Sequence, residues 1–158
     1  MNDNLVAAKA AIVAFFTALG TFLGWKGIMA LVWVILMALD YISGTFAAMK
    51  AGEWCSAKAR EGAWHKGGAF LVVIVAFIVD IIMLIICGNI PVLGWTWPEI
   101  ILPLVLAWYI ITELGSILEN AIKLGANPPA WLTKILKASL QAVENVGEGA
   151  LDSKEDLN

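Results

Sequence analysis

The sequence predicts an all-α integral membrane protein with three or four transmembrane helices and a C-terminal amphipathic helix. Of its 158 residues, 61% are hydrophobic and 15% are charged, whereas a soluble domain typically has about 45–50% apolar and about 25% charged residues. A soluble core of this size cannot hide so much apolar surface. Several apolar runs also approach the length of about 20 residues that a helix needs to cross a bilayer. Lipid is therefore the expected surrounding of most of the chain.

Charge, cysteine and histidine content exclude several classes of function. The net charge is −3, from 10 basic and 13 acidic residues, so we expect no polybasic surface for nucleic acid. Cys55 and Cys87 form neither a disulfide framework nor a CxxC metal pair. His65 is the only histidine, which excludes metal sites that need two, and no glycine-rich phosphate loop is present. The sequence predicts a protein that is not an enzyme, has no cofactor and does not bind nucleic acid.

Four apolar stretches are candidate spans, at about 5–25, 27–49, 67–87 and 100–122. The first is short and takes in Lys9, so it either spans or lies in the interface as a surface helix. Acidic residues interrupt the other three stretches. We expect residues 1–126 to form the transmembrane domain.

The basic residues predict the orientation of the spans, because cytoplasmic loops carry the excess of lysine and arginine. The predicted loop 50–66 has four basic residues, the loop 88–99 has none, and the segment after Ala121 again has four. The loop 50–66 and the C-terminus are therefore predicted to be cytoplasmic. If the chain has four spans, the N-terminus is also cytoplasmic, and Lys26 is the one basic residue that falls on the outer side. If it has three spans, the N-terminus lies outside.

The segment 127–158 differs in character from the spans. It opens with Asn127-Pro128-Pro129, a helix-stopping signal. From 130 to 146, apolar residues recur at three- and four-residue steps, which predicts an amphipathic helix. We expect this helix to lie on the cytoplasmic membrane surface or against a neighbouring chain, followed by an acidic, disordered end.

Acidic residues inside the spans are candidate functional groups, because a charge near the bilayer centre costs about 2.5–3.5 kcal/mol on insertion scales. Asp40 lies about 15 Å from Lys50 along a helix, and Asp80 about 21 Å from Lys66. No basic residue is expected at matching depth, so these acids should be protonated, bonded to polar groups or in contact with water. They either hold helices together or line a water path, and both readings stay open.

The last span adds a polar stripe at helical spacing. Including Asp40 and Asp80, the predicted pore-lining or interhelical polar residues are Asp40, Asp80, Glu113, Ser116, Glu119 and Asn120. Glu119 lies four residues before Lys123, so for Glu119 we favour a simple interfacial ion pair. Gly20 and Gly24 form a GxxxG pattern, and with Gly44 they are the predicted helix-packing glycines.

Three blocks of residues carry a resemblance to a known family. They are Asp40-Tyr41-Ile42-Ser43-Gly44; Ser56-x-Lys58 with Gly62 and Lys66; and the long block from Trp108 to Ala121, followed by Leu124-Gly125 and Pro128-Pro129. On these blocks the chain resembles phage holins of the toxin-secretion and phage-lysis type, which include clostridial toxin-export holins. Thr112 and His65 depart from the family pattern, which usually has asparagine and a basic residue there.

The resemblance implies a phage-encoded protein of the bacterial cytoplasmic membrane. Such proteins form homo-oligomers and open lesions through which an endolysin, or a toxin in some relatives, crosses the membrane. Direct contact between the lesion-forming protein and the endolysin is not required. Two alternatives remain open on the residues themselves. One is a small ion or proton channel or transporter that uses Asp40 and Asp80. The other is a non-conducting antiholin whose polar face only mediates association.

Overall fold

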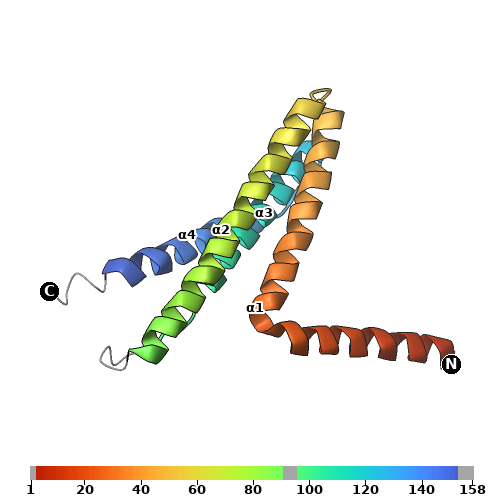
Figure 1. Ribbon diagram of the computed structural model, residues 1–158. Coiled ribbons are helices and arrows are strands. Elements are labelled where there is room, and N and C mark those ends of the chain that lie inside the picture. The colour runs from red at the N-terminus through yellow and green to blue at the C-terminus, as the bar shows by residue number, and fades with distance from the viewer. Residues whose placement is uncertain (1–2, 91–95, 153–158) are drawn as a thin grey trace.

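The computed structural model describes residues 3–90 and 96–152, which form four helices and no strand. The helices are α1 (Asp3–Lys50), α2 (Ser56–Asn89), α3 (Ile101–Leu124) and α4 (Ala130–Asp152). The second half of α1 runs beside α2 and α3 as a bundle of long rods, and α4 folds back from the end of α3 (Figure 1). The predicted all-α class is confirmed.

Three helices are long and apolar enough to cross a membrane: Gly24–Lys50, Ser56–Asn89 and Ile101–Leu124. Large apolar side chains on their outer surfaces are exposed, for example Leu71 at 65% and Val75 at 58%. Such a surface is stable against lipid tails and unstable in water. For most of the residues in the predicted span 5–25, the structure does not describe the side chains. That span, and the side of the membrane on which the N-terminus lies, therefore stay predictions.

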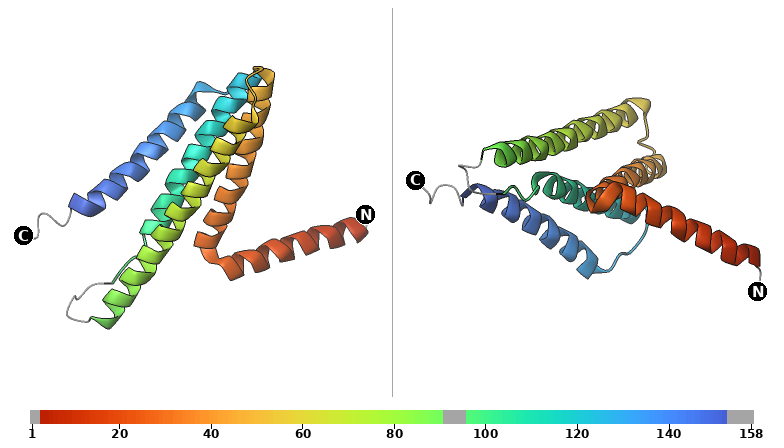
Figure 2. Two further views of the ribbon diagram at one scale, coloured as in Figure 1. Left: turned by 45° about the horizontal axis from the view of Figure 1, so that its top comes forward. Right: turned by 60° about the horizontal axis from the view of Figure 1, so that its bottom comes forward.

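The α1 helix contains a sharp change of direction. Its backbone is non-helical at Gly24, with φ 62° and ψ 179°, a conformation that residues with a Cβ atom rarely adopt. The first half of α1 consequently points steeply away from the bundle in both Figure 1 and Figure 2. The stretches 5–25 and 27–49 thus correspond to two helical segments of α1 that meet at this bend.

The connection between α1 and α2 is shorter than the predicted loop 50–66. A tight turn over residues 51–55 includes Gly52 at φ 71°, and the Glu53 N–H donates to the Ala48 carbonyl at 3.0 Å. The α2 helix begins at Ser56, before the predicted span 67–87. The basic residues of this segment are therefore carried on a helix, which decides where Lys66 lies.

The α3 helix is central, because it packs against α1, α2 and α4, whereas α1 and α2 meet each other least. The apolar core of the bundle is small. The Trp33 ring lies 4.9 Å from the Phe70 ring and 5.6 Å from the Tyr109 ring, between centroids. The buried core residues are Trp33, Met37, Ala76, Leu102 and Leu106.

The α4 helix begins at the predicted position and packs on α3 and no other described helix. The α3 helix ends at a left-handed Gly125 with φ 105°, a common helix stop. Trp108 Nε1 then donates to Glu144 Oε1 at 3.1 Å across the α3–α4 contact. The amphipathic helix, expected on the membrane surface or against a neighbouring chain, thus lies against α3 of its own chain.

Candidate functional site

Three charged residues of the bundle lie at one depth. Asp40 is ten residues before the end of α1, Lys66 is ten residues after the start of α2, and Glu113 is eleven residues before the end of α3. Because α2 runs antiparallel to α1 and α3, each lies about 15–17 Å from the same end of the bundle. We call this end, which contains the turn 51–55, the turn end, and the opposite one the far end.

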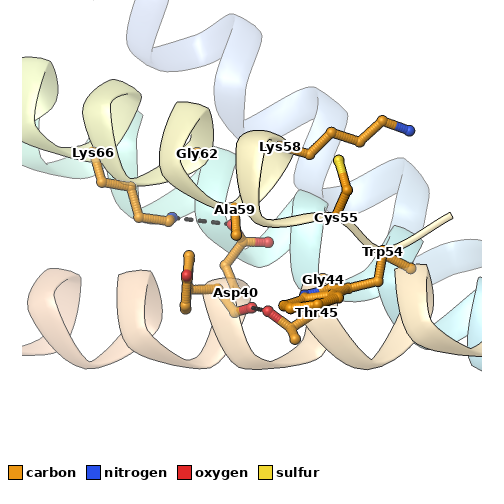
Figure 3. A pocket seen from close by; sticks show the side chains of 11 residues that line it. Asp40, Gly44, Thr45, Trp54, Cys55, Lys58, Ala59, Gly62 and Lys66 are labelled. Atoms are coloured by element: carbon orange, nitrogen blue, oxygen red, sulfur yellow. Dashed lines mark hydrogen bonds and ion pairs between the residues drawn. The ribbon is translucent and has the colours of Figure 1, made fainter.

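Lys66 bridges the two carboxylates at this depth. Its Nζ lies 3.0 Å from Asp40 Oδ2 and donates to Glu113 Oε1 at 2.9 Å and Oε2 at 2.7 Å. The Lys66 side chain is directed from α2 toward α1 (Figure 3). The expectation that no basic residue reaches Asp40 is therefore wrong, because the segment assumed to be a loop is helical and carries Lys66 inward.

An amide completes the group. Asn120 Nδ2 donates to Asp40 Oδ1 at 3.0 Å and to Ser43 Oγ at 3.1 Å. Ser43 Oγ in turn donates to the Asp40 carbonyl at 3.1 Å. A Cβ atom at Gly44 would lie 3.4 Å from Asn120 Nδ2, so the glycine permits this close approach of α1 and α3. We call Asp40, Ser43, Lys66, Glu113 and Asn120 the Lys66 cluster.

The electrostatics of the Lys66 cluster make it a strong joint between helices. Glu113 is 8% exposed and Asn120 is 7% exposed, so the polar groups are largely removed from solvent. A buried ion pair offsets the desolvation of its charges only while both partners remain. The cluster draws side chains from α1, α2 and α3 and therefore ties all three together. It can separate only where water or new polar partners replace the lost contacts.

A hollow of about 210 Å³ reaches the cluster from between α1 and α2. Asp40 and Lys66 line it, together with Thr45, Trp54 and Gly62 (Figure 3). The hollow lies toward the turn end, where α1 and α2 meet only loosely. One side of the cluster is thus open to small molecules such as water.

Asp80 lies apart from the cluster and caps the start of α3. Its carboxylate accepts from Trp97 Nε1 at 2.8 Å and from the backbone N–H groups of Ile101 at 3.2 Å and Leu102 at 2.9 Å. The first N–H groups of a helix have no partner within it, and the positive end of the helix dipole favours an anion. With 3% of Asp80 exposed, this carboxylate is a buried cap that joins α2 to α3. The sequence did not predict the hydrogen bond between Trp97 and Asp80.

The other end of α3 is held by a cation. Lys50 Nζ donates to the carbonyls of Leu124 at 2.7 Å and Lys123 at 3.3 Å, where a positive charge complements the helix dipole. At the far end, Lys26 forms an ion pair with Glu99 just before α3. Lys26, the basic residue on the predicted outer side, therefore has an acidic partner.

The predicted polar stripe of α3 divides between two surfaces. Glu113 and Asn120 face α1 and α2, whereas Ser116 and Glu119 line a groove of about 350 Å³ between α3 and α4. Of the predicted packing glycines, Gly44 lies at the α1–α3 contact. At Gly24, where α1 bends, no atom lies within 4 Å of the position that a Cβ atom would take, and Gly20 is outside the described side chains. Packing of the Gly20 and Gly24 pair between copies stays a prediction.

Comparison with known proteins places these features in a family. A model of the bacteriophage holin family matches residues 17–141. An uncharacterized 14.9 kDa protein of Clostridium perfringens, from the nagH 3′ region, is 30% identical over 137 residues, which cover 87% of this chain and 96% of that protein. A second uncharacterized C. perfringens protein is 28% identical, with 87% of this chain and 93% of that protein covered.

A more distant relative is an uncharacterized protein of Listeria innocua, which is 27% identical over 131 residues, with 83% of this chain and 85% of that protein covered. No solved structure matches. The family match contains every residue of the Lys66 cluster and all three helices that are long and apolar enough to cross a membrane. The chain belongs to the bacteriophage holin family.

Proposed function

We propose that this protein is a holin that associates with copies of itself in the bacterial cytoplasmic membrane and opens lesions for an endolysin. Family membership supports this role. The observation that carries it is the Lys66 cluster, because a single chain holds charged groups paired inside an otherwise lipid-facing bundle. These groups are the polar surface that a water-filled lesion needs.

In this proposal the closed form keeps the Lys66 cluster intact. In a lone chain only the small hollow beside Asp40 and Lys66 can admit water, and no partner chain replaces the contacts of Lys66, Asp40 and Glu113, so separating them is costly. When copies accumulate, association turns these side chains toward a shared aqueous space, where water solvates them. Opening is then a shift of population from the packed to the hydrated arrangement. The loose contact of α1 with α2 and the hollow beside it support separation at the turn end.

We further propose that the turn end and the C-terminus face the cytoplasm. The first turns of α2 carry Lys58, Arg60 and Lys66, while the connection between α2 and α3 carries no lysine or arginine. Basic residues near span ends favour the cytoplasmic side. A reporter fused after Asn158 should therefore behave as a cytoplasmic protein, and a periplasmic signal would contradict the orientation.

The direct test is inducible expression in a bacterium that also makes a cytosolic endolysin. We expect collapse of the membrane potential, followed by release of the endolysin and lysis. Release of cytosolic reporter proteins of graded size measures the width of the lesion. Intact cells with the protein abundant in the membrane would overturn the proposal.

Glu113→Leu tests whether the cluster takes part in lysis. It removes the carboxylate that accepts both short bonds from Lys66 and should delay or abolish lysis at equal membrane abundance. Glu61→Leu is the matched control, because Glu61 is an exposed acid on α2 outside the cluster.

Ion flux without endolysin release would instead indicate a channel, and delay of lysis by a second holin, without lysis by this protein alone, would indicate an antiholin. Homo-oligomers should form in the membrane whether or not endolysin is present.

A further inference from the structure

The hollow beside the Lys66 cluster is polar and extends over several helical turns. The residues that line it begin with Trp54 and Cys55 in the turn and continue along α2 to Lys66 (Figure 3). Despite their ion pair, the side chains of Asp40 and Lys66 keep 16% and 21% of their surface exposed. A volume of about 210 Å³ beside a carboxylate and an ammonium group is large and polar enough to hold water.

Beyond Lys66 the gap between α1 and α2 changes in character. It continues as a groove of about 460 Å³ whose lining toward the far end is apolar and includes Val34, Met37 and Phe70. Tyr41 and Lys66 also line this groove, and both belong to the hollow as well. Apolar walls favour lipid tails over water. The lining of the gap therefore changes from polar to apolar at Lys66.

Three aromatic side chains lie behind the cluster on the side of the far end. Phe70 follows Lys66 by four residues, so it shares a face of α2 with Lys66 and lies about 6 Å nearer the far end. Tyr109 precedes the cluster glutamate of α3 by four residues, and Trp33 precedes the cluster aspartate of α1 by seven. The Trp33 ring packs against both other rings. We call Trp33, Phe70 and Tyr109 the aromatic layer.

Trp33 is the centre of the aromatic layer and carries an unused hydrogen-bond donor. Its side chain is buried, with 1% exposed, and its Nε1 has no hydrogen-bond partner among the described residues. A buried donor without a partner is costly, and a water molecule that reached this N–H would relieve the cost. The layer is therefore held by packing, and hydration of Trp33 favours the layer once it has opened.

We propose that the aromatic layer is a barrier to water and that the hollow on its turn-end side is a water-filled vestibule. A single chain then holds water to the depth of Lys66, about 15 Å from the turn end, and apolar packing stops the water there. The proposal deepens the proposed function and rests on it for one point, that lesion formation opens the barrier. Loss of the layer would join the vestibule to the far end.

Cysteine labelling in lipid nanodiscs tests the vestibule, because the reagent reaches both faces of a nanodisc. The full-length chain carries Cys55→Ser and Cys87→Ser, and the probe is a charged, membrane-impermeant thiosulfonate, which reacts with the thiolate that forms in water. Gly62→Cys lies in the hollow, and the neighbouring Ala63→Cys lies in the apolar groove. We expect Gly62→Cys to react at least about tenfold faster. Equal rates would overturn the vestibule.

Ala76→Cys tests the barrier, because Ala76 is 3% exposed on α2 and lies six residues beyond Phe70 toward the far end. Its labelling should be slow while the layer is intact. Trp33→Ala should raise the rate at least about tenfold, because it opens the layer to water. Trp33→Phe keeps an aromatic ring and should raise the rate much less. Phe46→Ala is the matched control, since Phe46 is 57% exposed on α1, and it should leave the rate unchanged.

The contrast between Gly62→Cys and Ala63→Cys also reports whether a Trp33 variant keeps its bundle. Where the contrast persists in Trp33→Ala, unchanged labelling of Ala76→Cys would overturn the barrier. Where the contrast is lost, Trp33→Leu, which removes less volume, takes the place of Trp33→Ala under the same criterion.

Inducible expression separates this proposal from the holin function. Trp33→Ala should collapse the membrane potential earlier than the native chain at equal abundance, and collapse at the same time would contradict the role of the layer in lysis. The expected labelling without lysis by the native chain would support the barrier and refute the holin function. Lysis with equal labelling of Gly62→Cys and Ala63→Cys would refute the vestibule and leave the holin function standing.

Discussion

The two ends of α3 are held by different kinds of contact. At the far end, Asp80 accepts hydrogen bonds from backbone N–H groups of α3, whose positions the helix itself determines. Toward the turn end, Lys66 meets Asp40 and Glu113 through long side chains from three helices. In the first contact one short side chain meets backbone groups that the helix holds in place, whereas in the second the groups lie on side chains of three helices and can change by side-chain rotation and small helix shifts. Under the proposed function, we therefore expect the far end to act as the fixed joint and the turn end as the one that opens.

The largest effect is expected from removing the cation of the movable joint. Lys66→Met leaves Asp40 and Glu113 buried without a positive partner, which should cost about 3–5 kcal/mol in the free energy of unfolding. Reversible unfolding in mixed detergent micelles measures this cost. Lys58→Met is the control, because the Lys58 side chain is 65% exposed, and it should change stability little. A further combination with Asp40→Asn and Glu113→Gln should recover much of the loss, and no recovery would refute the electrostatic cause.

The fixed joint should be nearly as sensitive but different in kind. Asp80→Ala removes the acceptor of three hydrogen bonds and the anion at the start of α3, which should cost about 3 kcal/mol. Amide hydrogen exchange should then increase at Ile101 and Leu102, whose N–H groups lose their partner. If exchange instead increased around Asn120, the two ends would not be independent joints. Val79→Ala, a change at an exposed neighbouring position, provides the control.

A smaller effect is expected where α1 approaches α3. Gly44→Leu places a side chain against Asn120 and should cost about 2 kcal/mol by overpacking. Gly62→Leu is the matched control, since no atom lies within 4 Å of a Cβ atom there. Equal stability of the two variants, measured in the same micelles, would show that the stability of the bundle does not depend on the close contact of Gly44 with Asn120.

The smallest effect is expected from Lys50→Met, which removes a cation from the exposed end of α3. A charge that complements a helix dipole at an exposed terminus contributes about 0.5 kcal/mol. High salt should reduce the difference between the variant and the native chain. A loss as large as that of Lys66→Met would mean that the turn end is held mainly by Lys50.

Sequence reasoning found three helices that are long and apolar enough to cross a membrane, because composition and run length are sufficient to predict them. The predicted span 100–122 nearly coincides with α3, and the predicted helix from residue 130 is α4. It did not find the partner of Asp40, because a basic segment between apolar runs was taken as loop. Ten residues separate Asp40 from the end of α1 and Lys66 from the start of α2, so a helical reading of 56–66 would have placed them together.

The role of Asp80 could not be obtained in the same way. Its partners are backbone groups of α3 and the indole of Trp97, and nothing in the sequence places the start of α3 beside Asp80. That position depends on how far the connection after Asn89 returns along α2. The polar stripe of α3 is likewise divided between the Lys66 cluster and the groove beside α4. This division depends on where α4 packs, and the spacing of residues within α3 does not predict that position.

The kink at Gly24 has a consequence for the thickness of membrane that this chain can fit. Without it, the 48 residues of α1 would form a straight rod of about 72 Å, against a hydrocarbon core of about 30 Å. One glycine torsion divides that rod into an upright part of 27 residues, Gly24–Lys50, and a separate arm. The upright part is about 40 Å long, which matches the thickness of a bilayer with its headgroup regions. A single backbone angle therefore limits the upright length of α1 to what a bilayer can surround.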